Sequence, residues 1–181
     1  NVLIRIEQPK KDAGTATLRT GHNMWNYLPK IDRVVRVPAS MMMASWMGSH
    51  FTNDDLVKES RLIRDYAIET TFQGPRDGVE VYEFTLTPNP DAPVVWGRMV
   101  YQVRQADTMP VWARFYAEDG TLKSTAGFSD YVVMDGRLVP TRLRMTPQDK
   151  PGEFTEMHYL SLAFNVAIPP NMFALSSLRG S

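Results

Sequence analysis

The sequence contains no cysteine, which excludes a disulfide framework, a thiolate metal site and a cysteine nucleophile. It also lacks an excess of either charge, since 20 Lys and Arg residues balance 20 Asp and Glu residues. The opposite charges are interspersed along the chain rather than gathered in blocks. Such a sequence has no basic surface of the kind that binds nucleic acid, so we predict no nucleic-acid partner.

Long hydrophobic runs are missing too. A transmembrane helix needs about 20 consecutive apolar residues, and the Met-rich run at residues 41–47 is far shorter. We therefore predict that the protein is not an integral membrane protein. The sequence shows no signal peptide and opens with the strand-like NVLIRIEQ, so we expect a piece that starts inside a domain. We place one domain at residues 1–181, a length that can bury a good core.

Patterns for catalysis and metal binding are scarce. The three histidines, His22, His50 and His158, are far apart and lack ligand spacing such as H-x-x-x-H. There is no G-x-S-x-G nucleophile motif and no Walker A loop. The neighbouring carboxylates Asp54 and Asp55 are better explained by helix capping than by acid–base catalysis. We predict no catalytic residue, no metal and no cofactor, and hence no enzyme.

Short, alternating segments bounded by Gly, Pro, Asn and Asp dominate the rest of the chain, and short links between them favour antiparallel pairing. A terminal helix is expected over Asn171–Leu178, with Asn171 as its cap. The pattern predicts one large, strongly curved antiparallel sheet with short helices covering its concave face. The expected strands are Val2–Glu7, Thr15–Thr20, Met24–Leu28, Arg33–Val37, Tyr66–Gln73, Val79–Thr87, Val94–Val103, Pro110–Ala117, Thr121–Ser129, Tyr131–Met134, Arg137–Thr146 and Phe154–Val166.

The stretch from Met41 to Asp55, MMMASWMGSHFTNDD, interrupts these strands. It is apolar at first but has no strand pattern. Ser40 is a plausible N-cap and Gly48 a plausible stop, so the spacing predicts a helix of about two turns between them. A second start signal at Thr52 predicts another short helix that ends near Ser60.

In the first of these helices, Met42 and Trp46 are four residues apart, and so are Met43 and Met47, so they form one apolar stripe. Apolar stripes at helical spacing are usually core. Methionine, however, adapts its shape and suits surfaces that bind varied ligands. We expect this stripe to be either packed core or the mobile cover of an apolar cavity.

A cavity of this kind needs a wall, which inward-facing residues of the strands would supply. In the strand Arg137–Thr146, Val139, Thr141, Leu143 and Met145 share one face. Together with the stripe, the predicted ligand-binding residues are Met42, Met43, Trp46, Met47, Phe51, Trp25, Tyr82, Phe84, Leu143 and Met145.

Several segments carry a recognisable family pattern. They are Leu18-Arg19, Asn23–Lys30, Arg33–Pro38, Ser45–Ser49 and Phe51–Leu56. Through them the chain resembles bacterial outer-membrane lipoprotein-sorting proteins of the LolA/LolB superfamily. The match is close over Thr15–Tyr66 and looser to the end, where Pro169–Leu178 is similar to the closing segment of the family. The words W-M-G-S and F-T-N-D-D-L are fairly specific to one uncharacterised branch.

The resemblance implies an incomplete antiparallel barrel closed by a lid of helices, a periplasmic location, and a cavity that shields the acyl chains of lipoproteins. Family members have a leader and an N-terminal helix before the first strands, so a LolA-like domain at residues 1–181 would lack both. The lid of the classical carrier is locked by an arginine, for which Arg5, Arg19 and Arg36 are candidates. An acidic residue is usual in the family where His50 stands.

Three functions follow as hypotheses. The first is a periplasmic carrier or binding protein for lipoprotein acyl chains or a similar apolar ligand, with envelope transport proteins as possible partners. The second is a non-catalytic envelope interaction module, accessory to an export system, whose cavity is packed core. The third, an enzyme on lipid-like substrates, has the least support because no catalytic constellation is present.

Overall fold

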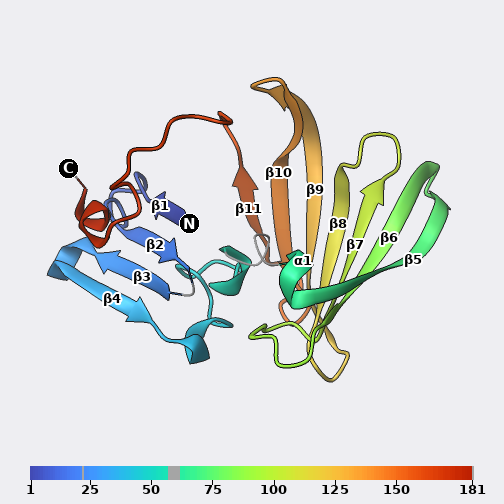
Figure 1. Ribbon diagram of the computed structural model, residues 1–181, viewed down its shortest axis with the longest axis horizontal. Coiled ribbons are helices and arrows are strands. Elements are labelled where there is room, and N and C mark those ends of the chain that lie inside the picture. Colours follow the sequence, from blue (N-terminus) through green and yellow to red (C-terminus); the bar gives the residue numbers. More distant parts are fainter. Residues whose placement is uncertain (22, 57–61, 181) are drawn as a thin grey trace. The chain divides into compact units, whose positions relative to one another are not determined.

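The computed structural model describes residues 1–21, 23–56 and 62–180. Their eleven strands form two antiparallel sheets, one of four strands and one of seven (Figure 1). The predicted class, mainly β and antiparallel, is confirmed. The division into two sheets differs from the single sheet that we expected. No pairing joins β4 to β5, and the described residues between them form short helical segments and a single isolated bridge, Ser45 with Thr52.

Two compact units make up the chain. Unit 1 comprises Asn1–Ala44, Asn53–Val57 and Asn165–Ser181, and unit 2 comprises Ser45–Thr52 and Lys58–Phe164. Each unit contains one of the two sheets, and each is described by itself below.

Unit 1 is built on the four-stranded sheet, in which each strand pairs with its neighbour in sequence. Its apolar cluster has Ala16, Leu18 and Leu178 as buried members, with Trp25 and Tyr27 packed against them. Leu178 therefore brings the C-terminal segment into the core of the sheet formed by the first strands. The four strands are β1 (Val2–Arg5), β2 (Ala16–Thr20), β3 (Asn23–Leu28) and β4 (Arg33–Val37).

In the described residues of unit 1 the helices are short 3-10 segments of three to five residues. They are η1 (Pro29–Ile31), η2 (Ala39–Met41), η3 (Asp54–Leu56) and η5 (Leu175–Arg179). The helix expected over Asn171–Leu178 is therefore shorter than predicted. Its N-cap is Ala174, without a side-chain hydrogen bond, so the prediction of Asn171 as the cap was wrong.

Unit 2 is built on the seven-stranded sheet, ordered β11-β10-β9-β8-β7-β6-β5. Every strand pairs antiparallel with its sequence neighbour, as the short turns predict, and Figure 1 shows the sheet curling at β5 and β6. The single α-helix among the described residues, α1 (Leu62–Asp65), directly precedes β5. The strands are β5 (Tyr66–Arg76), β6 (Val79–Pro88), β7 (Arg98–Arg104), β8 (Pro110–Tyr116), β9 (Leu122–Met134), β10 (Arg137–Pro147) and β11 (Thr155–His158).

Three strands differ most from the prediction. The segments Thr121–Ser129 and Tyr131–Met134 are one strand, β9, because β10 pairs with β9 on both sides of Asp130. β7 begins only at Arg98, after the backbone at Gly97 passes close to Glu118. The strand expected over Phe154–Val166 is reduced to the four residues Thr155–His158, which pair with Arg142–Met145 of β10.

The two faces of the seven-stranded sheet differ in chemistry. On one face the register aligns apolar side chains across the strands, as in the row Leu86, Met99 and Phe115. On the other face charged and polar side chains meet, and Glu156 accepts hydrogen bonds from Arg144 at 2.7 Å and Arg142 at 2.8 Å. The hydrogen bond from Arg144 is the largest cause of a lowered pKa at Glu156, and the bond from Arg142 adds to it. Desolvation acts in the opposite direction but does not outweigh them, so the pKa of Glu156 is lowered to about 2.

Candidate functional site

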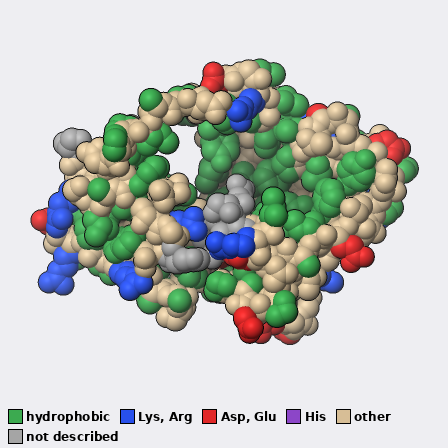
Figure 2. All heavy atoms as spheres, in the orientation of Figure 1, with side chains coloured by type: hydrophobic (Ala, Val, Ile, Leu, Met, Phe, Trp, Pro, Cys, Tyr) green, Lys and Arg blue, Asp and Glu red, His purple; other side chains and the backbone are tan. Residues whose placement is uncertain are grey.

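The apolar face of the seven-stranded sheet is the candidate functional site. It follows from strict alternation along long strands, because every second side chain points to the same face. Leu143 and Met145 share this face, as predicted, while Arg142 and Arg144 point to the other. Figure 2 shows hydrophobic side chains gathered over this sheet.

One part of the apolar face is sealed. Its side chains are buried, and residues from outside the sheet or at its edge pack over them, among them Phe51 and Trp96. Trp96 stacks on Phe115 in a tilted arrangement with ring centroids 5.3 Å apart. The buried members of this cluster are Phe51, Tyr66, Leu86, Trp96, Met99, Ala113, Phe115, Ala126 and Met145. This part is ordinary core and holds unit 2 together.

The remaining part of the same face is only half-buried. It is more aromatic than the sealed part, and Tyr82 and Phe84 lie with their ring centroids 5.9 Å apart. Its side chains pack against the buried cluster but keep part of their surface accessible. The half-buried members of the face are Phe84, Tyr101, Phe128, Leu143 and Met157, with Tyr82 beside Phe84. We call this set the open half of the apolar face.

Three residues that the sequence analysis did not select take part in this face. Tyr101, Phe128 and Met157 belong to the open half. All three lie in alternating segments, so the same pattern that identified Leu143 predicts their orientation once strand register is known. Trp96 lies in the irregular segment before β7, although the expected strand Val94–Val103 included it, and its indole N–H has no hydrogen-bond partner among the described residues.

The Met-rich stretch forms a small hairpin rather than a helix, so the helix expected between Ser40 and Gly48 was wrong. The backbone N–H of Trp46 donates to the carbonyl of Phe51 at 2.7 Å, and Ser45 pairs with Thr52. Met47 and Gly48 take positive φ values of 52° and 74° at the turn. The i, i+4 stripe of Met42 with Trp46 and of Met43 with Met47 is therefore absent.

Asn53 explains why the helix does not form. Its side-chain amide donates to the carbonyl oxygens of Met41, at 2.9 Å, and Ala44, at 3.3 Å. In an α-helix these oxygens would accept from the amides four residues further on. An asparagine that competes for backbone groups ends the η2 turn and directs the chain into the hairpin. The expected second helix is reduced to η3 (Asp54–Leu56), and the remainder of it, up to Ser60, lies outside the described residues.

Three of the four methionines of this stretch, Met41, Met43 and Met47, are exposed, and Met42 is half-buried. Met43 and Met47 are 46% and 38% exposed. Met42 and Met43 belong to unit 1, whereas Trp46 and Met47 belong to unit 2. The residues predicted to cover a ligand together are thus divided between the units, and their contact with a ligand stays a prediction.

The tip of the hairpin, residues 45–52, is fixed to the sheet of unit 2 at two points. Phe51, only 4% exposed, enters the buried cluster. His50 contacts Thr155 twice, through its backbone N–H at 3.0 Å and its ring Nδ1 at 2.9 Å, and its Nε2 lies 3.1 Å from Glu153 Oε2. The Thr155 hydroxyl accepts from the backbone N–H of His50, and the two ring contacts hold the imidazole between Thr155 and Glu153.

Trp25 does not lie with the other predicted wall residues. It packs in the unit 1 cluster beside Leu18, while Tyr82, Phe84, Leu143 and Met145 lie in unit 2. The three candidates for a lid arginine, Arg5, Arg19 and Arg36, all lie on the four-stranded sheet of unit 1. A locking role for any of them stays a prediction.

Neither a metal cluster nor a membrane span is found in residues 1–21, 23–56 and 62–180. No group of three or more His, Asp or Glu side chains is arranged to hold a metal ion there. In the same residues no helix has the length and apolar character needed to cross a bilayer.

A family model described as “Uncharacterized protein” matches residues 1–180. The chain belongs to this family. No curated protein matches the chain, but several solved structures are similar to it. A domain from Vibrio parahaemolyticus described as an outer membrane lipoprotein-sorting protein domain is 26% identical, with a TM-score of 0.85 over 98% of this chain and 76% of that chain.

Two further structures are similar. A DUF1329 family protein from Desulfovibrio piger is 25% identical, with a TM-score of 0.87, over 97% of this chain and 75% of its own. A LolA superfamily protein from Nitrosomonas europaea is 22% identical, with a TM-score of 0.77, over 96% of this chain and 76% of its own, and shows the shared fold. The resemblance to lipoprotein-sorting proteins, predicted from the sequence, is therefore confirmed.

Proposed function

We propose that this protein is a periplasmic, non-catalytic carrier or binding protein that holds the acyl chains of lipoproteins, or a similar apolar ligand. The observation that carries the proposal is the open half of the apolar face. Its aromatic and aliphatic side chains adjoin a well-packed core yet keep accessible surface. Each methylene that a ligand buries there contributes about 0.8 kcal/mol, so an acyl chain supplies ample binding energy.

The likeness to an outer membrane lipoprotein-sorting protein domain supports an acylated lipoprotein as the ligand and envelope transport proteins as partners. We propose Tyr82, Phe84 and Leu143 as ligand contacts, because they lie in or beside the open half. Met145 adjoins them but is buried in the cluster, so it contacts a ligand only if the core opens.

We propose the hairpin tip, residues 45–52, as the movable cover of this face. It carries Trp46 and Met47, and its single buried side chain is Phe51. A short segment with one buried anchor and one polar clamp is the kind of element that opens locally without unfolding the sheet.

The test places a charge on the open half of the apolar face. Phe128→Glu should weaken binding of a fluorescent fatty-acid analogue at least tenfold, because the carboxylate stays hydrated and repels the chain. The matched control is Ser129→Glu, one residue along β9, whose side chain lies opposite Arg142 on the polar face. It should bind the analogue like the unmodified protein, and circular dichroism should show both variants folded.

Three outcomes contradict the proposal. Unchanged binding in a folded Phe128→Glu variant would show that the ligand, if any, lies elsewhere. Unfolding of this variant alone would show that the face is permanent core and would favour the interaction module. Mass spectrometry of an organic extract of the purified protein then identifies the ligand, and an extract free of lipids also counts against a carrier.

A further inference from the structure

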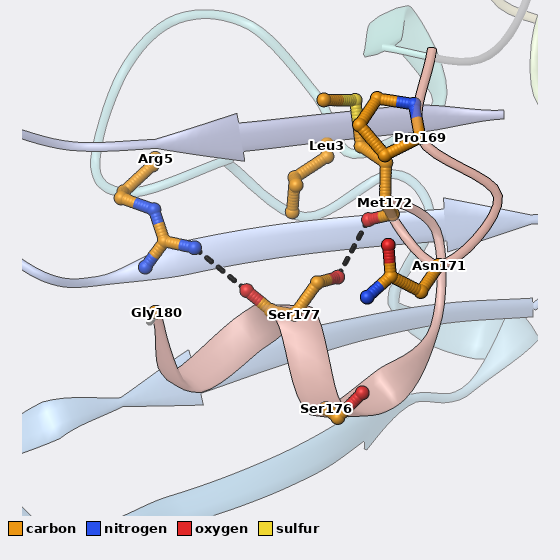
Figure 3. Close-up of a pocket in the computed structure, with 8 residues that line it drawn as sticks. All are labelled: Leu3, Arg5, Pro169, Asn171, Met172, Ser176, Ser177 and Gly180. Atoms are coloured by element: carbon orange, nitrogen blue, oxygen red, sulfur yellow. Dashed lines mark hydrogen bonds between the residues drawn. The ribbon is translucent and has the colours of Figure 1, made fainter.

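A pocket of about 510 Å³ lies in unit 1, between β1 and the C-terminal segment (Figure 3). This volume falls within the usual range for small-molecule sites, about 300–1,000 Å³. Leu3 and Arg5 line it from β1, two residues apart and therefore on the same face of the strand. The C-terminal segment supplies the opposite wall.

Arg5 gives this pocket a positive charge. Its Nη2 donates to the carbonyl of Ser177 at 2.6 Å, and its Nη1 lies 3.5 Å from the carbonyl of Leu178. A guanidinium has five N–H donors, so about three remain for a ligand. Within the described residues, Arg5 forms no ion pair, and none of the pocket-lining residues is acidic. By contrast, the nearby Arg179 is neutralised by Asp32 at 3.0 Å.

The two carbonyls also fix the guanidinium in place, so a ligand does not have to order it. Gly180 lies directly against it. A Cβ at this position would stand 2.9 Å from Arg5 Nη1, and the φ of 79° is one that residues with side chains rarely adopt. A glycine here lets the backbone approach without covering the cation.

The rest of the pocket is partly apolar. Leu3, Pro169 and Met172 lie near one another away from the guanidinium, whereas the amide of Asn171 adds a polar group on their side (Figure 3). The pocket therefore combines a fixed cation, which has no acidic partner in the part of the chain that the structure describes, with an aliphatic patch.

We propose that this pocket binds a small amphiphilic anion, with a carboxylate or phosphate head on Arg5 and a short aliphatic chain on Leu3, Pro169 and Met172. A guanidinium matches both head groups because its planar donors pair with two oxygens at once. This site lies in unit 1 and is separate in residues and in ligand charge from the acyl-binding face proposed for unit 2.

The experiment is calorimetric titration of the full chain with octanoate and with monooctyl phosphate. The anion that binds with the higher affinity identifies the preferred head group. Octanol, which has the chain without the charge, and acetate, which has the charge without the chain, should each bind at least tenfold more weakly. Raising the salt concentration should weaken binding of the anion because Arg5 is exposed. Equal binding of octanol, or no binding of either anion, overturns the proposal.

Variants locate the site. Arg5→Gln should weaken anion binding at least tenfold, while Arg33→Gln, the same charge change on β4 of the same sheet, should leave it unchanged. Met172→Glu should also weaken it at least tenfold, and more than the neutral Met172→Gln. If Arg5→Gln does not fold, the Met172 pair decides, and equal affinity in both members overturns the proposal. Phe128→Glu should not alter anion binding, which separates this site from the acyl-binding face.

Discussion

Truncation of Phe51 distinguishes a movable cover from permanent core. The ring is almost completely buried in the cluster of unit 2. A phenylalanine buries about 150–250 Å², which at about 25 cal/mol per Å² corresponds to about 4–6 kcal/mol. Measured Phe→Ala substitutions in cores cost about 3–5 kcal/mol. We expect Phe51→Ala to remove a stabilisation of about 3 kcal/mol or more from the hairpin tip.

The amides whose exchange the lost stabilisation accelerates depend on whether the hairpin tip opens without the sheet. If it does, amide exchange within residues 45–52 should accelerate by about two orders of magnitude, since every 1.4 kcal/mol is a factor of ten. The Trp46 amide is a suitable reporter because its hydrogen bond to the Phe51 carbonyl closes the tip. Amides in the centre of β9 should keep their exchange rates. Hydrogen exchange read by NMR measures both sets in one sample.

Phe115→Ala is the matched control. Phe115 is 1% exposed and lies on β8 in the same cluster, so its truncation should destabilise the whole sheet and accelerate exchange in β9. The reasoning is refuted if Phe51→Ala accelerates exchange in β9 as much as in the tip. The tip would then unfold only with the sheet and would not be a cover.

Two further predictions concern stability. Glu156 has a folded-state pKa of about 2, below its ordinary value of 4.5, so its contribution to stability is complete above pH 4.5 and is lost as the pH falls towards 2. Between these pH values, urea midpoints should therefore fall more steeply for the unmodified protein than for Glu156→Gln, and equal slopes would contradict this. Gly97→Ala should lower the free energy of unfolding, measured by urea titration, by about 1–3 kcal/mol, because its Cβ would stand 2.5 Å from Glu118 Cα. Gly127→Ala, whose Cβ meets nothing within 4 Å, should be neutral or stabilising by up to about 1 kcal/mol, and a similar loss in both would refute the steric argument.

The strands of unit 2 were predictable because alternation is a local property. Leu143 and Met145 lie on one face of their strand, and Arg142 and Arg144 lie on the opposite face. This holds whatever the partner strands are. Short turns such as Asp135-Gly136 then require neighbouring strands to pair antiparallel. The apolar face of the candidate site, and the places of Tyr82, Phe84, Leu143 and Met145 in or beside it, follow from these two facts.

The features that were missed depend on distant partners. The Met-rich stretch has helical spacing, but the Asn53 amide takes two backbone carbonyls and Phe51 gains more by entering the core of unit 2. The segment after His158 is apolar enough for a strand, yet β10 pairs with only four residues of it. Trp25 alternates correctly on β3, but its own sheet turned out to be separate from the sheet of the other wall residues.

The clusters of the two units differ in how far apart their members lie along the chain. Strands β5 to β11 pair only with their neighbours, so the sheet of unit 2 can assemble hairpin by hairpin with short loops to close. The cluster of unit 1 joins Leu18 to Leu178 across almost the whole sequence. During synthesis, the first four strands must therefore wait for the segment that covers them, while unit 2 can already be complete. Leu18 and its neighbours stay uncovered over that interval, so unit 1, although its sheet is smaller, is the part of this chain most in need of protection from aggregation before folding ends.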